Sequence, residues 1–251
     1  MIASAMFLNS TSQSYVNERK ATNEIYMWGE GGEICSAQIK TPENYYMFRL
    51  KAKKSMHKLL EKANPKIRKR VDSNDLEQII VGIYDGSEIY SQLADMRYVE
   101  IAKFYHESGF VKDIIHQHGE KGIGAIKVST GIGLLNTIRK DVNSMSKESF
   151  RKLNPKTQNI LNKIKKYEIN SKNISDWLVK DYIFNIICSM CYDNENLNYF
   201  SGDVHLAIRA YQRGKWGTVQ NNYLKRVMSV HNQISEESFP RYIITEQRKR
   251  L

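Results

Sequence analysis

The sequence predicts a mainly α-helical protein with at most one small β element. Apolar residues recur at intervals of three and four through most of the chain, which is the period of a helix with one buried face. Only 4 prolines and 14 glycines occur among 251 residues, so long flexible linkers have little place. At this length we expect one or two domains. No run approaches 18 consecutive apolar residues, so no membrane-spanning helix is expected.

The N-terminal third of the chain changes character near residue 40. Residues 1–40 are polar without a clear period, so we expect an irregular arm there. Residues 45–63 place their apolar side chains on one helical face and are expected to form a helix. These side chains are Tyr45, Phe48, Ala52, Met56, Leu59, Leu60 and Ala63. Pro65 follows and is expected to act as a stop.

The next two segments lead to the first candidate site residue. Residues 73–84 predict a helix, and a short strand at 79–84 is the alternative because β-branched residues cluster there. Residues 87–108 are expected to form one or two helices, and Gly109 suits the position just past a helix end. Glu107 therefore falls on the last turn of a helix.

The second half of the chain is expected to be helical outside one glycine-rich loop. Residues 111–134 are interrupted by glycine and predict a folded loop that enters a short helix. The helical period then returns in four segments, which are 158–167, 177–192, 204–211 and 219–231. Asp203 suits the N-cap of the third of these helices.

The chain is strongly basic, with 38 Lys and Arg against 27 Asp and Glu and a formal net charge of +11. Such a charge favours polyanions, whether nucleic acid, anionic membrane or the acidic bacterial wall. The basic residues are scattered, and no single helix collects them with polar base-reading side chains on one face. Solvated helix faces are the plain interpretation, and no nucleic-acid partner is expected.

Cysteine and histidine patterns give weak signals for redox or metal chemistry. Three cysteines are too few for a disulfide framework. Cys188 and Cys191 fall in a helical apolar stripe and are expected to be buried thiols. A metal site is an alternative whose spacing does not fit helical ligands, formed by His106, His116, His118 and Asp113. No metal and no cofactor is expected.

Glu107 has the surroundings that glycoside chemistry needs. A glycosidic bond breaks when its oxygen is protonated as the bond to C1 stretches, and this requires a carboxylic acid that keeps its proton near neutral pH. Burial beside apolar groups raises a carboxyl pKa in this way. The neighbours Phe104, Tyr105 and Phe110 fit such a setting. Asp113 is the nearest second carboxylate.

Glu107 also begins a pattern of fixed spacing that ends at Thr130. Ser108, Gly109 and Phe110 follow it directly, and Gly119 and Gly122 come twelve and fifteen residues later. Downstream residues continue the pattern: Asn185, Ile186, Tyr192, Phe200, Gly202, Asp203, Ala210, Tyr211, Gln212, Gly214, Tyr223 and Val227. The pattern resembles the catalytic domain of the soluble lytic transglycosylases and goose-type lysozymes, over roughly residues 90–232.

The resemblance implies a lysozyme-like helical domain at 89–235. It leaves 1–88 as an N-terminal arm and helical extension, and 236–251 as a basic C-terminal tail. It also implies peptidoglycan lytic transglycosylase activity without a cofactor. In that family one Glu acts as acid and then as base, and the substrate's own C6 hydroxyl closes a 1,6-anhydro ring.

The resemblance assigns roles to residues of this chain. Glu107 is the acid and base, and Tyr211 lies beside it and orients it by a phenol hydrogen bond. Six residues are expected to bind the glycan: Ser108, His116, Gly122, Tyr192, Gln212 and Trp216. Trp216 would stack on a sugar ring.

The chain departs from the family pattern at three positions, where His116 replaces a Ser, Ala125 a substrate-binding Gln, and Gln212 an Asn. A noncatalytic wall-binding or scaffold protein of the same fold is therefore one alternative. A hydrolysing lysozyme is another, since no clear water-activating carboxylate is evident.

The expected partner is the glycan strand of peptidoglycan, with a secretion, flagellar or phage assembly as a further setting. The implied location is periplasmic or otherwise extracytoplasmic. No export signal is evident in the chain, although Ala3-Ser4-Ala5 looks like a signal-peptidase site.

Overall fold

The computed structural model describes residues 24–28, 34–38, 43–166, 170–214 and 222–235. The chain is mainly α and divides into two compact units, Met1–Glu43 and Asn44–Leu251. In the first unit, β1 (Glu24–Trp28) pairs antiparallel with β2 (Ile34–Gln38). The prediction of an irregular arm is therefore wrong for these strands. The missed signal is the run from Ile25 to Trp28, whose β-branched and aromatic residues favour strands.

The second unit begins with helices whose starts are set by side-chain caps. Asn44 caps α2 (Tyr45–Lys62) by accepting a hydrogen bond from the Met47 amide at 3.0 Å. Pro65 does not simply stop that helix, because it occupies the first turn of α3 (Pro65–Arg68), where its missing N–H costs nothing. Asp72 and Asp75 form a capping box at the start of α4 (Ser73–Ile89). The alternative strand at 79–84 is wrong, since this segment lies inside α4.

The segment before the candidate site forms two helices, as expected. The 3₁₀ helix η1 (Ser91–Met96) leads directly into α5 (Arg97–Ser108). Gly109 ends α5 with a left-handed φ of 62°, and its amide bonds to the Tyr105 carbonyl. Glu107 lies on the last turn, as predicted.

Most of the remaining helices are longer or more divided than their sequence signals, whereas the last helix begins and ends four residues later than the predicted 219–231. They are α6 (Val128–Ser144), α7 (Lys147–Lys152), α8 (Pro155–Lys166), α9 (Ser171–Lys180), α10 (Tyr182–Tyr199), α11 (Val204–Arg213) and α12 (Tyr223–Ser235). The single helix expected at 177–192 is wrong. Asp181 breaks it, because its carboxylate caps the Phe184 amide and so starts a new helix.

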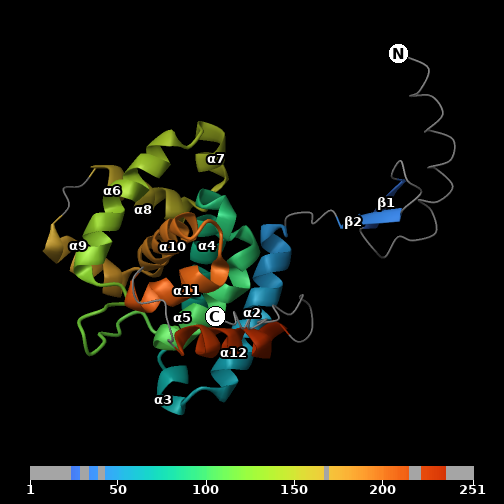
Figure 1. Cartoon of the computed structure of the whole chain (residues 1–251). Coiled ribbons are helices and arrows are strands. Elements are labelled where there is room, and N and C mark those ends of the chain that lie inside the picture. The colour runs from blue at the N-terminus through green and yellow to red at the C-terminus, as the bar shows by residue number, and fades with distance from the viewer. Residues whose placement is uncertain (1–23, 29–33, 39–42, 167–169, 215–221, 236–251) are drawn as a thin grey trace, which may run out of the picture. The chain divides into compact units, whose positions relative to one another are not determined.

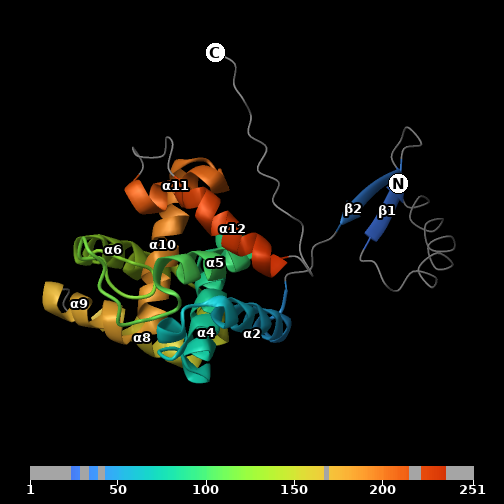
Figure 2. The ribbon, with the colours of Figure 1, turned by 90° about the horizontal axis from the view of Figure 1, so that it is seen from below.

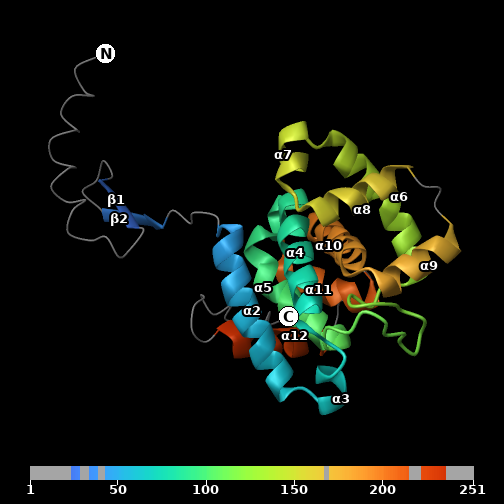
Figure 3. The same cartoon turned by 180° about the vertical axis from the view of Figure 1, so that it is seen from behind.

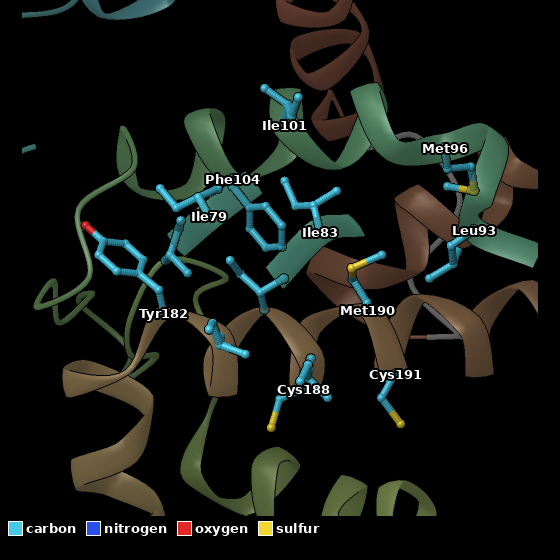
Figure 4. Close-up of a cluster of buried hydrophobic side chains, with 14 of the residues drawn as sticks. Ile79, Ile83, Leu93, Met96, Ile101, Phe104, Tyr182, Cys188, Met190 and Cys191 are labelled. Carbon is cyan, nitrogen blue, oxygen red and sulfur yellow. The ribbon is translucent and has the colours of Figure 1, made fainter. Parts of the chain in front are cut away.

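The core of the second unit is built around α10 (Figure 1), which packs against α4, α6, α8, α9 and α11. Apolar side chains from α4, α5 and α10 converge there (Figure 4), including Ile79, Phe104 and Met190. Cys188 and Cys191 are buried free thiols in this core, as expected for that pair. The side chain of Cys35 is not among those described.

The expected boundary at residue 88 does not coincide with a division in the structure. The contact between α4 and α10 is the most extensive between any two described helices, and α2 packs on α4 and α5 (Figure 3). Glycines allow this approach, since a Cβ on Gly86 would lie 2.4 Å from the Met190 sulfur and one on Gly82 3.0 Å from Ile186. The helices expected to be an extension therefore share one core with the rest of the second unit.

The helix α12 packs against α5 (Figure 2), and the glycine-rich loop follows α5 in the chain. None of the described helices combines the length and the apolar character needed to cross a membrane.

Candidate active site

The turn after α5 is held in an uncommon backbone conformation. Phe110 follows Gly109 with a φ of 68°, which costs a side-chain-bearing residue about 1–2 kcal/mol. Its ring is fully buried, and its carbonyl accepts a hydrogen bond of 2.8 Å from the Tyr182 hydroxyl. The buried ring and this hydrogen bond fix where the chain leaves α5, and hence where Glu107 lies.

Ser108 is expected at the site, but it is not among the residues that line the pocket beside Glu107. Its side chain is buried, and its hydroxyl donates to the Phe104 carbonyl one turn earlier at 3.0 Å. The hydroxyl of Ser108 is therefore engaged within its own helix, and its expected contact with the glycan stays a prediction.

The glycine-rich loop is fastened to α10 by one side chain. The Asn185 amide nitrogen donates to the carbonyls of Lys121 and Leu178, at 3.0 and 2.9 Å. Its oxygen accepts from the Gly124 amide at 2.8 Å. A Cβ on Gly122 would lie 2.0 Å from the Leu178 carbonyl oxygen. Gly122 therefore allows the loop to dock on α10, and its expected contact with substrate stays a prediction.

A pocket of about 660 Å³ lies beside Glu107. Five of the residues expected at the site line it: Glu107, His116, Tyr192, Tyr211 and Gln212. They come from α5, the glycine-rich loop, α10 and α11, so the fold brings together positions up to 105 residues apart in the chain. The pocket has the size of a small-molecule site. Trp216 falls outside the described residues.

Glu107 is the group in this pocket suited to acid catalysis. Burial raises the pKa of its carboxyl, while the Tyr223 hydroxyl and the Lys103 ammonium oppose the rise and Glu120 adds to it. The net direction is upward, so Glu107 keeps its proton to higher pH than an ordinary Glu.

The tyrosine whose hydroxyl is directed at Glu107 is Tyr223, not Tyr211. The Tyr211 hydroxyl is engaged elsewhere, with the Ser189 hydroxyl at 2.7 Å and the Gly124 carbonyl. The prediction that Tyr211 orients Glu107 by a hydrogen bond is therefore corrected. The Tyr223 hydroxyl interacts with Glu107 more loosely than a full hydrogen bond, because it is a buried polar atom without a partner at hydrogen-bond geometry.

Glu120 is a second pocket carboxylate that the sequence did not single out. Burial acts to raise the pKa of Glu120, but its own backbone amide and Lys127 outweigh this and lower it. The Lys127 ammonium lies 3.5 Å from the Glu120 carboxylate. The pocket therefore holds one carboxyl that favours its proton and one that favours its charge. Asp113, the second carboxylate considered from sequence, instead pairs with Arg70 at 2.6 Å on the surface.

His116 brings an unpartnered polar atom to the pocket. Its Nε2 atom is buried without a hydrogen-bond partner among the described residues. Burial also lowers the pKa of this imidazole, so it favours the neutral form. A neutral imidazole can donate or accept one hydrogen bond to a ligand, in keeping with the expected substrate-binding role.

Ala125 lines the same pocket, at the position where the resembled family carries a glutamine.

Among the described residues, no group of three or more His, Cys, Asp or Glu could hold a metal ion. Comparison of the chain with family models, with curated proteins and with solved structures found no match.

Proposed function

We propose that this protein is a peptidoglycan lytic transglycosylase that cleaves the MurNAc–GlcNAc β-1,4 bond, with Glu107 as acid and then base. One observation carries the proposal: a half-buried carboxyl with a raised pKa lies in the wall of a pocket of about 660 Å³. The motif resemblance around Glu107 supports the choice of peptidoglycan as the substrate.

In the proposed reaction Glu107 donates its proton to the glycosidic oxygen as the bond from that oxygen to C1 breaks. The resulting carboxylate takes the proton of the C6 hydroxyl while O6 bonds to C1. The products are a 1,6-anhydro sugar and a free 4-hydroxyl end, and no water is consumed. A raised pKa suits the first step, because Glu107 keeps its proton to higher pH than an ordinary Glu and so has it to donate.

Glu120 favours a second candidate, a hydrolysing lysozyme. A carboxylate that stays ionised in the same pocket can activate a water molecule for attack at C1. Ala125 favours a third, a wall-binding protein of the same fold without activity, because a methyl group cannot make the hydrogen bonds of a glutamine.

The proposed partner is the peptidoglycan strand, in a periplasmic or otherwise extracytoplasmic setting. The net charge of +11 would hold the protein on the anionic wall. Local cleavage of the wall would serve a secretion, flagellar or phage assembly that has to pass through it.

The test is incubation of wild type, Glu107→Gln and Glu120→Gln with purified peptidoglycan, followed by mass spectrometry of the released muropeptides. The proposal expects anhydro-muramyl products from wild type and Glu120→Gln, and none from Glu107→Gln. Reducing-end products that disappear in Glu120→Gln would establish the hydrolase. Wall binding without release, by all three proteins, would leave a binding module and overturn the proposal.

A further inference from the structure

Three charged side chains are buried together behind the pocket. Glu100 and Lys103 of α5 and Asp193 of α10 have side chains no more than 2% exposed. The Lys103 ammonium lies 2.7 Å from a Glu100 carboxylate oxygen and forms a second ion pair with Asp193. Burying ionisable side chains away from water is costly, and a buried ion cluster is weak evidence for stability. The cluster therefore calls for a role other than stability.

The position of Lys103 connects the cluster to the site. It lies one helical turn before Glu107 on α5, on the same side of the helix. Its ammonium is 4.2 Å from the centre of the Tyr211 ring, which lines the pocket. The Tyr211 ring stacks on the Tyr223 ring, and Tyr223 interacts with Glu107. Lys103 is therefore a cation directly behind the aromatic wall of the pocket.

We propose that Lys103 is a positioning residue for Glu107: held by Glu100 and Asp193, it keeps a fixed positive charge one turn below Glu107 and so sets the pH at which Glu107 loses its proton. The catalytic consequence rests on the proposed function, whereas the effect on Glu107 does not. Glu100 and Asp193 keep Lys103 positively charged although its side chain is buried away from water.

The protonation states within the cluster follow from their surroundings. Burial acts to lower the pKa of Lys103, but Asp193 and Glu100 outweigh this and raise it, so the lysine stays charged. Burial and the charge of Glu100 raise the pKa of Asp193 well above its usual range. Asp193 therefore favours its neutral form, while Lys103 keeps its positive charge beside it.

The charge of Lys103 acts on Glu107 against the effect of burial. A nearby cation favours the carboxylate and so lowers the pKa of Glu107. Several other groups face Glu107 or its surroundings from the neighbouring elements. They are His106 of α5, His116, His118, Glu120 and Lys127 of the pocket loop, Tyr192 of α10, Tyr211 of α11, and Tyr223 and Arg226 of α12. Replacing the cluster leaves all of these in place.

The test measures the titration of Glu107 directly by carboxyl ¹³C NMR, with the Glu107 signal assigned by its absence in Glu107→Gln. The main variant, Glu100→Gln/Lys103→Met/Asp193→Asn, replaces the cluster with neutral side chains of similar size. It leaves no buried charge unpaired. We expect its Glu107 midpoint to lie at higher pH than that of wild type.

Arg97→Met is the matched control. It removes another buried cation from α5, ten residues before Glu107 and so roughly 15 Å away along the helix axis. It is expected to leave the midpoint unchanged. An unchanged or lower midpoint in the cluster variant, or an equal rise in Arg97→Met, would overturn the proposal. Should the triple variant fail to fold, Glu100→Gln/Lys103→Met gives the same test, because the Asp193 that remains favours its neutral form.

The NMR measurement separates this proposal from the proposed function. Where peptidoglycan is cleaved, the alkaline limb of the activity profile should move to higher pH in the cluster variant and stay in place in Arg97→Met. A raised midpoint in a protein that releases no glycan would support the role of Lys103 and reject the reaction. Cleavage of peptidoglycan with an unchanged Glu107 midpoint and an unchanged alkaline limb in the cluster variant would support the reaction and reject the role of Lys103.

Discussion

The rings of Tyr211 and Tyr223 stack with their centres 6.4 Å apart and only 8° from parallel, yet their hydroxyl groups interact with different residues. The Tyr211 hydroxyl binds the Ser189 hydroxyl and the Gly124 carbonyl, and so joins α11 to α10 and to the glycine-rich loop. The Tyr223 hydroxyl faces Glu107. Tyr211 therefore holds the elements of the pocket together, whereas Tyr223 changes the pKa of Glu107.

Replacing each tyrosine by phenylalanine should expose this division. Tyr211→Phe leaves the buried Gly124 carbonyl without its donor, so the free energy of unfolding should fall by about 1–3 kcal/mol. Tyr223→Phe removes a hydroxyl without a full hydrogen bond, so that free energy should hardly change. Because this hydroxyl lowers the pKa of Glu107, its loss should raise that pKa and move the alkaline limb of activity upward. Urea denaturation and a pH profile of glycan release measure the two effects, and equal loss of stability in both variants would contradict the division.

Glu107 should lower the free energy of unfolding at neutral pH. Burial raises the pKa of Glu107 in the folded protein. Loss of its carboxyl proton therefore costs more free energy in the folded protein than in the unfolded chain. Any stabilisation by the protonated form is present at low pH and is lost as pH rises through the raised pKa. Glu107→Gln should therefore stabilise the protein at pH 7–8 and have little effect near pH 4. Thermal denaturation at both pH values tests this, and a gain of equal size at both would contradict it.

Two glycines of the same loop should respond differently to alanine. Both have positive φ values, 73° at Gly122 and 83° at Gly119, so each alanine costs roughly 1 kcal/mol in backbone strain. A Cβ at Gly119 meets nothing within 4 Å, whereas one at Gly122 would lie 2.0 Å from a backbone oxygen and 2.2 Å from the Asn185 amide. Gly119→Ala should cost about that strain alone. Gly122→Ala should cost more than about 3 kcal/mol, since the loop has to leave α10. The comparison of their denaturation midpoints decides, and similar losses would show that the loop does not dock as described.

A buried carboxyl away from the pocket should make the stability depend on pH. Burial raises the pKa of Asp85 to about 6, although its carboxylate accepts a hydrogen bond of 3.0 Å from the Asn154 amide. Because the folded-state pKa is raised, the stability associated with this group is complete below about pH 4. It is lost as pH rises to about 6, in total on the order of 3 kcal/mol.

Asp85→Asn should remove that loss and stabilise the protein at pH 7 relative to wild type. Thermal denaturation between pH 4 and pH 7 measures it. Asp176→Asn on the exposed face of α9 is the control and should keep the pH dependence of wild type. If Asp85→Asn and Asp176→Asn behave alike, the burial of Asp85 has no such effect.

The sequence by itself determined the helical class of the protein and the local features of its site. The apolar spacing of 45–63 predicts α2, and Gly109 predicts the end of α5 and so the place of Glu107 on its last turn. Asp203 predicts the start of α11. These features depend on residues within a turn or two of each other, where helical period, caps and glycine conformations act.

Only the tertiary structure decided which distant residues meet. It brought Glu120 into the pocket, gave the contact with Glu107 to Tyr223, and placed Lys103 with Asp193, 90 residues away, in the dry space behind the site. It also joined α4 to α10 across the expected domain boundary. Such contacts arise from the packing of whole helices, whose crossing positions are set by side-chain shape over long sequence separations. The spacing of residues within one segment carries no record of them.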